Sequence, residues 1–153
     1  MEIVTARTPA HYATAVELFE EYATWLGVDL CFQNFRAELQ QLPQKYGPPT
    51  GELWLLEIEG QWVGCAALWQ LAPDTCEIKR MYVKPAYQGQ GWGKKLLIRA
   101  IETAQSLGYK KVKLDTLRRL TPAVALYESF GFVQTTPYNF NPEADVLYFE
   151  REV

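Results

Sequence analysis

The chain has 153 residues, 48% of them hydrophobic and 14% aromatic, which suffices for the core of a single domain spanning residues 1–153. Its formal net charge of -3 argues against a surface that neutralises nucleic-acid phosphates or anionic lipids, so we expect neither nucleic acid nor a membrane as a partner. Three cysteines without CxxC spacing, one histidine and the lack of a signal-type or membrane-spanning run predict reduced thiols, no metal site and a cytoplasmic location.

The first half of the chain predicts a strand, two helices, a loop and a meander of three antiparallel strands. Alternating polarity indicates the strands, and apolar residues at helical spacing indicate the helices. Thr8 followed by Pro9 is typical of a helix start, Gly27 of a helix end, and Pro43 ends the second helix. The loop is rich in proline and glycine, and we expect it to be mobile. In chain order the predicted bounds are 2–6, 8–27, 34–42, the loop 46–51, then 52–59, 62–71 and 76–83.

The second half predicts a glycine-rich turn, then helix, strand, helix and two closing strands. Gly108 and Gly131 supply helix ends, while Thr121 and Pro122 occupy the cap and first-turn positions of the last helix. Neither repeats nor a linker divide the chain, so the element order is that of one mixed α/β domain. The predicted bounds are 91–107, 111–115, 121–130, 132–136 and 146–151.

The most informative segment lies between the third meander strand and the next helix, where three glycines occur at alternate positions. Gly89, Gly91 and Gly93 allow a sharp turn and a close backbone approach to a ligand, and free N–H groups at a helix start carry partial positive charge. Lys94 and Lys95 follow in the first turn, where cations oppose the helix dipole unless an anion is nearby. This pattern predicts a site for a phosphate-bearing ligand.

Two common phosphate-binding patterns do not fit this segment. A Walker loop requires G-x-x-x-x-G-K-[ST], but Gln88 stands at the first glycine position and Lys95 stands where Ser or Thr is required. A dinucleotide fingerprint requires G-x-G-x-x-G, and counted from Gly89 the third glycine position holds Lys94. Binding of ATP or GTP in the Walker mode is therefore excluded and NAD is disfavoured, while a glycine-rich turn without a ligand stays open.

With these residues in view, the sequence resembles the GNAT superfamily of acetyltransferases, whose pyrophosphate loop reads [QR]-x-x-G-x-[GA]. Gln88, Gly91 and Gly93 match that loop, and AVALYESFGF at 123–132 resembles the family's A-[IV]-x-L-Y-x-x-x-G-F segment. The match covers residues 52–133. It implies an α/β (α+β) fold, with a mixed, mostly antiparallel sheet of six to seven strands flanked by about four helices.

The resemblance implies an N-acetyltransferase that moves the acetyl group of acetyl-CoA, its cosubstrate, to a primary amine. Many relatives carry Asn where this chain has Leu120, so no cofactor role is implied there. The tail at 137–142 resembles a bacterial branch of small-molecule acetyltransferases. The strand at 81–83 is similar to the strand whose backbone pairs with the pantetheine arm. The implied cofactor-binding residues are Met81, Tyr82, Val83, Gln88, Gly89, Gln90, Gly91, Trp92, Gly93 and Lys94.

Acetyl transfer to an ammonium requires a base, for which a carboxylate near the acceptor, acting directly or through water, is expected. Glu77 falls where related histone acetyltransferases carry their catalytic glutamate, and the alternative is a solvated strand-end acid. Asp115, at the end of the following strand, is a second candidate or a cap. Cys76 has no neighbouring histidine base, which favours a small buried strand residue over a nucleophile.

Tyr127 is implied by the resemblance to protonate the leaving thiolate, which suits a phenol because its pKa lies near that of a thiol. The alternative is that Tyr127 belongs only to the core.

The acceptor should be selected by the first fifty and last twenty residues, where six aromatic residues could line a mostly apolar cleft or belong to the core. Arg118 and Arg119 could contact an acceptor anion, the adenosine 3'-phosphate or only solvent. We expect a small-molecule amine, with a catalytically silent CoA-binding module and a protein or peptide N-acetyltransferase as alternatives. A homodimer formed through a sheet edge is a further hypothesis. The aromatic residues are Trp25, Phe32, Phe35, Tyr46, Tyr138 and Phe140.

Overall fold

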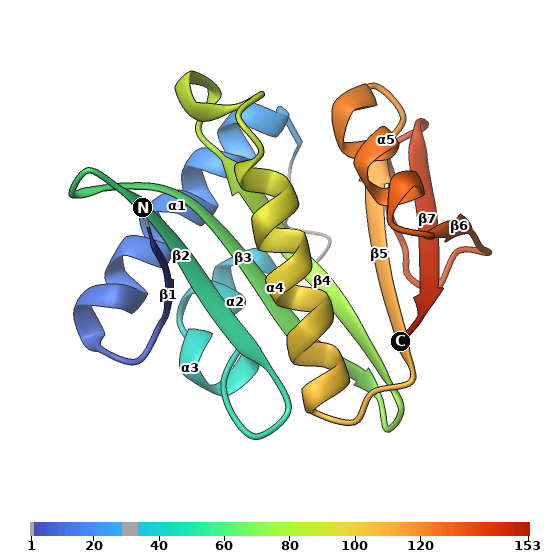
Figure 1. Ribbon diagram of the computed structural model, residues 1–153, viewed down its shortest axis with the longest axis horizontal. Coiled ribbons are helices and arrows are strands. Elements are labelled where there is room, and N and C mark those ends of the chain that lie inside the picture. Colours follow the sequence, from blue (N-terminus) through green and yellow to red (C-terminus); the bar gives the residue numbers. More distant parts are fainter. Residues whose placement is uncertain (1, 29–33) are drawn as a thin grey trace.

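The computed structural model of the chain describes residues 2–28 and 34–153, and these form a seven-stranded open sheet with helices on both faces (Figure 1). The strand order is β1-β2-β3-β4-β5-β7-β6. Every neighbouring pair is antiparallel except β4 and β5, which are parallel because helix α4 connects them as a crossover. The strands are β1 (Glu2–Thr5), β2 (Glu52–Ile58), β3 (Gln61–Ala72), β4 (Thr75–Val83), β5 (Lys111–Leu117), β6 (Val133–Gln134) and β7 (Val146–Glu152).

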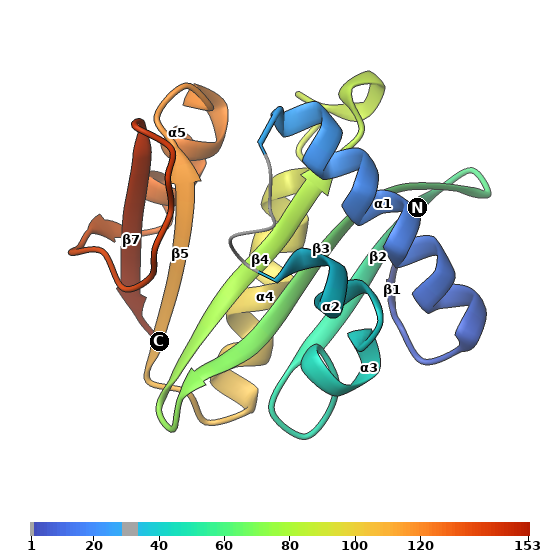
Figure 2. The ribbon, with the colours of Figure 1, turned by 180° about the vertical axis from the view of Figure 1, so that it is seen from behind.

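Two layers of helices enclose the sheet. Helices α4 (Trp92–Ser106) and α5 (Thr121–Ser129) cover the face seen in Figure 1. Helices α1 (Pro9–Leu26), α2 (Phe35–Leu39) and α3 (Leu42–Lys45) cover the opposite face, seen in Figure 2. Each layer buries its own apolar cluster, one including Leu96, Leu97 and Ala100 of α4 and the other including Leu18 and Phe19 of α1.

The parallel strands β4 and β5 stay paired over only three residues each. Thr75–Glu77 pair with 111–113, after which β4 runs on to Val83 and β5 to Leu117 without further pairing, and the strands diverge (Figure 2). Because each strand normally satisfies its N–H and C=O groups on a neighbour, this divergence leaves backbone groups of β4 available to a ligand. It is the feature that positions the site.

A β-bulge lies in β4 within this diverging stretch. Ala67 pairs with Lys79 but Cys65 pairs with Tyr82, so β4 holds an extra residue, and Arg80 there has a φ of 57° in the left-handed region. A bulge interrupts the alternation of side chains across a strand. Consequently Lys79 and Arg80 both lie toward the face that carries α2.

The predicted elements are confirmed, with three corrections. The expected helix at 34–42 is instead two short helices, and Pro43 lies within α3 rather than ending a helix. It is tolerated there because N–H groups of a first turn have no intrahelical partner. The cap of α5 is Leu120, one residue before the predicted Thr121. The strand predicted at 132–136 is only the two-residue β6. The described residues form five α-helices and a short 3-10 helix at Pro85–Tyr87, which fits the expected fold.

The predicted loop at 46–51 is confirmed, and its contacts tie it to the domain. Tyr46 is buried, the Gly51 N–H donates to the Gly47 carbonyl at 2.9 Å, and the Tyr109 hydroxyl donates to the Thr50 carbonyl at 2.5 Å. These contacts fix both ends of the loop, whereas its expected mobility stays a prediction.

Candidate active site

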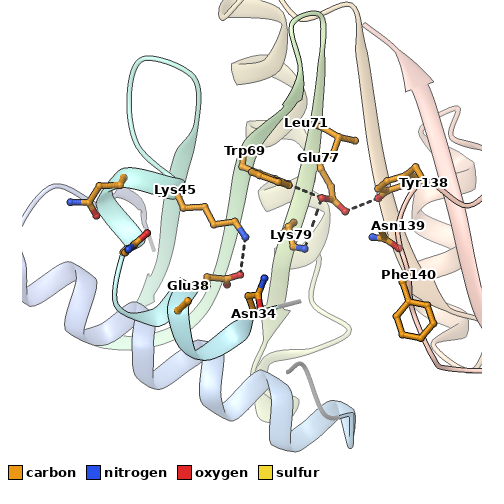
Figure 3. A pocket seen from close by; sticks show the side chains of 13 residues that line it. Asn34, Glu38, Lys45, Trp69, Leu71, Glu77, Lys79, Tyr138, Asn139 and Phe140 are labelled. Carbon is orange, nitrogen blue, oxygen red and sulfur yellow. Dashed lines mark hydrogen bonds and ion pairs between the residues drawn. The ribbon is translucent and has the colours of Figure 1, made fainter. Parts of the chain in front are cut away.

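Two cavities flank the point where β4 and β5 diverge. The first, of about 530 Å³, lies between Ile78–Val83 of β4 and Leu114–Leu117 of β5, and is bounded by the glycine-rich turn and α5. We call it the interstrand cleft. The second, of about 550 Å³, lies under α2 and α3 and is bounded by β3, β4 and the segment 138–140 (Figure 3). We call it the α2 cavity. Lys79 lines both.

The glycine-rich turn leaves open space over its backbone. Gly89 and Gly91 have φ values of 76° and 88°, a region that favours glycine, and a Cβ added at either would meet nothing within 4 Å. Gly91 is the N-cap residue of the 15-residue helix α4 and offers no side-chain acceptor to the first-turn N–H groups. These N–H groups and the helix dipole therefore remain available to an anion.

Nine of the ten predicted cofactor-binding residues line the interstrand cleft. Gln90 does not, and its side chain instead accepts a hydrogen bond from the Trp92 indole at 3.2 Å. Gln88 donates to the Val83 carbonyl at 2.8 Å, which ties the turn to the end of β4. The nine residues are Met81, Tyr82, Val83, Gln88, Gly89, Gly91, Trp92, Gly93 and Lys94.

Tyr127 belongs to the core and also lines the interstrand cleft. Its side chain is 7% exposed and lies against Phe132 and Phe149, with ring centroids 6.0 and 6.4 Å away. Within the described residues its hydroxyl has no hydrogen-bond partner. Burial raises the pKa of Tyr127 above the ordinary phenol value, which widens the gap from a thiol pKa. The expected match between the pKa values of the phenol and the thiol is therefore lost, and what favours a role for Tyr127 is its position in the lining of the cleft.

Glu77 lies in the α2 cavity and not in the interstrand cleft. Its side chain comes from the paired end of β4 and the residue is 1% exposed, so the alternative of a solvated strand-end acid is wrong. One carboxylate oxygen accepts a hydrogen bond from the Trp69 indole and the other from the Tyr138 hydroxyl, both at 2.6 Å (Figure 3). The Lys79 ammonium lies 3.9 Å away.

The segment 138–139 connects the two cavities. Burial, together with the charges of Glu77 and Asp115, raises the pKa of Tyr138, so its hydroxyl stays protonated and donates to Glu77. The Asn139 amide nitrogen donates to Asp115 at 3.0 Å, and Asp115 lines the interstrand cleft. Both candidate bases are thus held by neighbouring residues of one C-terminal segment.

A buried ion pair joins α2 to the bulge of β4. The Arg80 guanidinium donates through Nε and Nη2 to the Glu38 carboxylate at 2.8 and 2.9 Å, and both side chains are almost fully buried. Burial alone would raise the pKa of Glu38. The hydrogen bonds and the charge of Arg80 outweigh that effect and hold the pKa below its ordinary value. Lys45 of α3 adds a second cation 3.2 Å from the same carboxylate.

This polar cluster was not predicted from the sequence. The lining of the α2 cavity is mostly apolar, as expected, but it also carries the charged side chains of Glu38, Lys45, Glu77 and Lys79. One signal was present in the sequence: two adjacent cations, 79 and 80, stand in the middle of a strand that is buried for most of its length. Consecutive residues of a regular strand point to opposite faces, so it is the bulge that turns both toward the face that carries α2.

The six aromatic residues proposed for acceptor selection divide between several places. Tyr46 is buried in the core, and Phe35 packs against that core with Arg80 5.2 Å from its ring. Trp25 lines the interstrand cleft, while Tyr138 and Phe140 line the α2 cavity. Phe32 lies outside the described residues, as does Cys31.

Four further residues that were considered in the sequence lie in or near the interstrand cleft, on the surface or in the core. Arg119 lines the interstrand cleft and pairs with Asp145 at 2.9 Å and Glu143 at 3.5 Å, whereas Arg118 is exposed. Leu120 also lines the cleft, although no cofactor role was implied for it. Burial raises the pKa of Cys76 to about 12, which confirms a small buried strand residue and opposes a nucleophile.

Among residues 2–28 and 34–153, no group of three or more His, Cys, Asp or Glu side chains is arranged to hold a metal ion. Over the same ranges, none of the helices combines the length and apolar character that crossing a membrane requires.

Comparisons with known proteins agree with this geometry. The model of the acetyltransferase (GNAT) family matches residues 13–132. An uncharacterized N-acetyltransferase of Schizosaccharomyces pombe is 43% identical over 138 residues, covering 89% of this chain and 85% of its own. An acetyltransferase structure from Streptococcus agalactiae has a TM-score of 0.81 at 23% identity, covering 99% of this chain and 98% of its own. The Salmonella typhimurium structure of yncA with its cofactor acetyl-CoA has a TM-score of 0.70 at 23% identity, covering 99% and 93%. At such identities the two structures bear on the fold alone.

Proposed function

Because the chain belongs to the acetyltransferase (GNAT) family, we propose that it transfers the acetyl group of acetyl-CoA to the primary amine of a small molecule. One observation carries the proposal: the interstrand cleft and the α2 cavity meet at Lys79 and at the Asp115–Asn139 hydrogen bond, with Tyr127 on one side and Glu77 on the other. Donor and acceptor can therefore bind together, and direct attack in a ternary complex needs no covalent enzyme intermediate.

The interstrand cleft fits acetyl-CoA in three respects. The open space over Gly89 and Gly91, with the first-turn N–H groups of α4 and Lys94, suits a pyrophosphate. The backbone of β4 from Ile78 to Val83, which β5 leaves unpaired, suits the amides of a pantetheine arm. When bound, acetyl-CoA supplies an acetyl group activated as a thioester.

Glu77 is the proposed base, acting through Tyr138. The Tyr138 hydroxyl donates to one oxygen of the buried Glu77 carboxylate and can itself accept, so it gives an amine a route to Glu77. The Tyr138 hydroxyl can accept a proton from the ammonium while it passes its own proton to Glu77. One N–H bond breaks, one O–H bond forms on Glu77, and Tyr138 is unchanged. Asp115, which faces the interstrand cleft, is the alternative base.

Tyr127 is the proposed acid toward the leaving thiolate. Its hydroxyl belongs to a residue that lines the cleft, and no described residue accepts its proton. Since burial raises its pKa, the phenol stabilises the thiolate mainly by donating a hydrogen bond as the negative charge develops.

The test is to measure thiol release from acetyl-CoA against a panel of small amines and short peptides, alongside CoA binding. We expect micromolar CoA binding, release that depends on an amine, and an N-acetylated product detected by mass spectrometry. CoA binding without turnover on any amine would contradict the proposal and favour a silent CoA-binding module. Turnover on peptides alone would favour a protein acetyltransferase. A homodimer through an edge strand, β1 or β6, stays a separate prediction for measurement of the mass in solution.

A further inference from the structure

The α2 cavity has hydrogen-bond acceptors at one end, which suit a ligand donor, and an ammonium group at the other, which suits a ligand anion. We infer that it takes an amine that also carries a carboxylate, as a free amino acid does, with the amine at Glu77, Tyr138 and Asn139 and the carboxylate at Lys45. This inference rests on the proposed function and adds a substrate class to it. The cavity volume of about 550 Å³ lies within the usual range for small-molecule sites, roughly 300–1,000 Å³.

The amine end is marked by acceptors. The Asn139 side chain is oriented by Asp115, because a carboxylate accepts only and therefore faces the amide nitrogen. Its carbonyl oxygen Oδ1 is then left buried, with no hydrogen-bond partner among the described residues. Buried polar atoms normally have partners, so an orphan acceptor beside Glu77 and Tyr138 indicates a ligand that brings an N–H donor.

The carboxylate end is marked by a surplus cation. Arg80 forms two charge-assisted hydrogen bonds with Glu38, so its positive charge already compensates the negative charge of the Glu38 carboxylate. The Lys45 ammonium nevertheless lies 3.2 Å from the same carboxylate. Lys79 lies 3.9 Å from Glu77. Among the described residues, two cations, Arg80 and Lys45, thus face the single carboxylate of Glu38.

Within the described residues, the cluster at Glu38 therefore has one positive charge more than it has carboxylates, and a ligand carboxylate would neutralise that charge. Lys45 is well placed to meet that ligand carboxylate. Its ammonium lies 4.6 Å from the centroid of the Trp69 ring, and Trp69 in turn donates to Glu77, so the indole spans the distance between the two ends of the cavity. Figure 3 shows Lys45 and Glu77 pointing into the same space from opposite sides of Trp69. A ligand with both groups would occupy both ends at once.

The test compares matched acceptors that differ only in this charge. Acetyl-CoA turnover is measured with free L-amino acids and with the corresponding L-amino acid carboxamides, which keep the α-amine and lose the carboxylate. We expect at least one amino acid to be used with a kcat/KM about 10- to 100-fold above that of its carboxamide. Lys45→Met, which keeps the apolar stem over Trp69, should remove most of that preference by lowering the value for the acid alone. Lys110→Met, an exposed lysine outside both cavities, is the control and should keep the preference.

The outcomes separate this inference from the function on which it rests. Equal use of acids and carboxamides by the unaltered protein, or use of carboxamides alone, overturns the inference and leaves acetyl transfer standing. An acid preference that survives in Lys45→Met also overturns it. If no amine in the wider panel is acetylated although CoA binds, the proposed function itself fails. The substrate comparison in the unaltered protein decides the question even if the Lys45 variant does not fold.

Discussion

The interstrand cleft and the α2 cavity lie side by side, but they are built from different groups. The cleft offers backbone groups of one continuous stretch, from the unpaired part of β4 through the glycine-rich turn to the start of α4. The α2 cavity offers side chains from α2, α3, β3, β4 and the segment 138–140. A backbone group can be blocked or strained but not deleted, whereas a side-chain group is lost in one substitution. Changes in the cleft should therefore alter cofactor binding, and changes in the cavity should alter rate and acceptor choice.

The largest expected effect is a loss of kcat from a substitution in the α2 cavity. Glu77→Gln removes the proton acceptor while keeping the shape of the side chain, so kcat should fall about 10²- to 10⁴-fold with CoA affinity unchanged. Stopped-flow or steady-state thiol release, with CoA binding by calorimetry, measures both quantities. Asp115→Asn is the matched variant on the cleft side and should cost less. An unchanged rate and pH profile in Glu77→Gln, with a large loss in Asp115→Asn, would move the base to Asp115.

The next largest expected effect is a loss of CoA affinity from a substitution in the glycine-rich turn of the interstrand cleft. Gly91→Asp places a negative charge and a left-handed non-glycine residue at the start of α4, and should weaken CoA binding about 100-fold, with kcat at saturating acetyl-CoA changed much less. Gly108→Asp is the control, because Gly108 also has a positive φ, 85°, and open space around it, but lies at the other end of α4. Both variants should lose about 1 kcal/mol of stability, measured by urea unfolding. Equal loss of CoA affinity in both would refute the role of the turn.

The smallest effect concerns Tyr127, which belongs to both the core and the cleft. Tyr127→Phe should lower kcat about tenfold, because a thiolate with an ordinary pKa near 8.5 needs little help to leave. Full activity with intact CoA binding would reduce Tyr127 to a core residue.

The same variant carries a pH signature of stability. The pKa of Tyr127 is raised above the ordinary 10.0 by burial, so the folded state keeps a proton that the unfolded state loses. Its contribution is complete below pH 10 and declines as pH rises toward the folded pKa. Urea unfolding between pH 9 and 11 should show a shallower loss of stability in Tyr127→Phe than in the unaltered chain. An identical slope would contradict the burial of an unpartnered phenol.

The contrast between the two sites also explains what could be predicted from the sequence. The turn at Gly89, Gly91 and Gly93 was predictable because backbone binding imposes glycine at fixed spacing, and the element bounds followed from periodicity and end signals. Tyr127 and Glu77 were predicted through the resemblance to a family. Nothing in the spacing, however, indicates that Tyr138 lies against Glu77, 61 positions away.

The Glu38–Arg80 pair and the orphan oxygen of Asn139 depend on features that leave little trace in sequence. The two residues of the pair lie 42 positions apart in the sequence, and a bulge is needed to turn Arg80 toward α2, whereas the sequence predicted a regular strand over 76–83. The orientation of Asn139 follows from its hydrogen bond to Asp115, 24 positions away in the sequence. Tertiary contacts of this kind place the charged groups of the α2 cavity, which is why the sequence predicted its apolar lining but not its charged side chains.

A crystal structure of the protein with CoA and an amine acceptor tests the central claim most directly. The account predicts the pyrophosphate on the N–H groups of 89–94, the thiol between β4 and β5 beside the Tyr127 hydroxyl, and the amine in the α2 cavity within hydrogen-bond distance of Tyr138. Density for CoA outside the interstrand cleft, or for the acceptor on the far side of the sheet from Glu77, would contradict it.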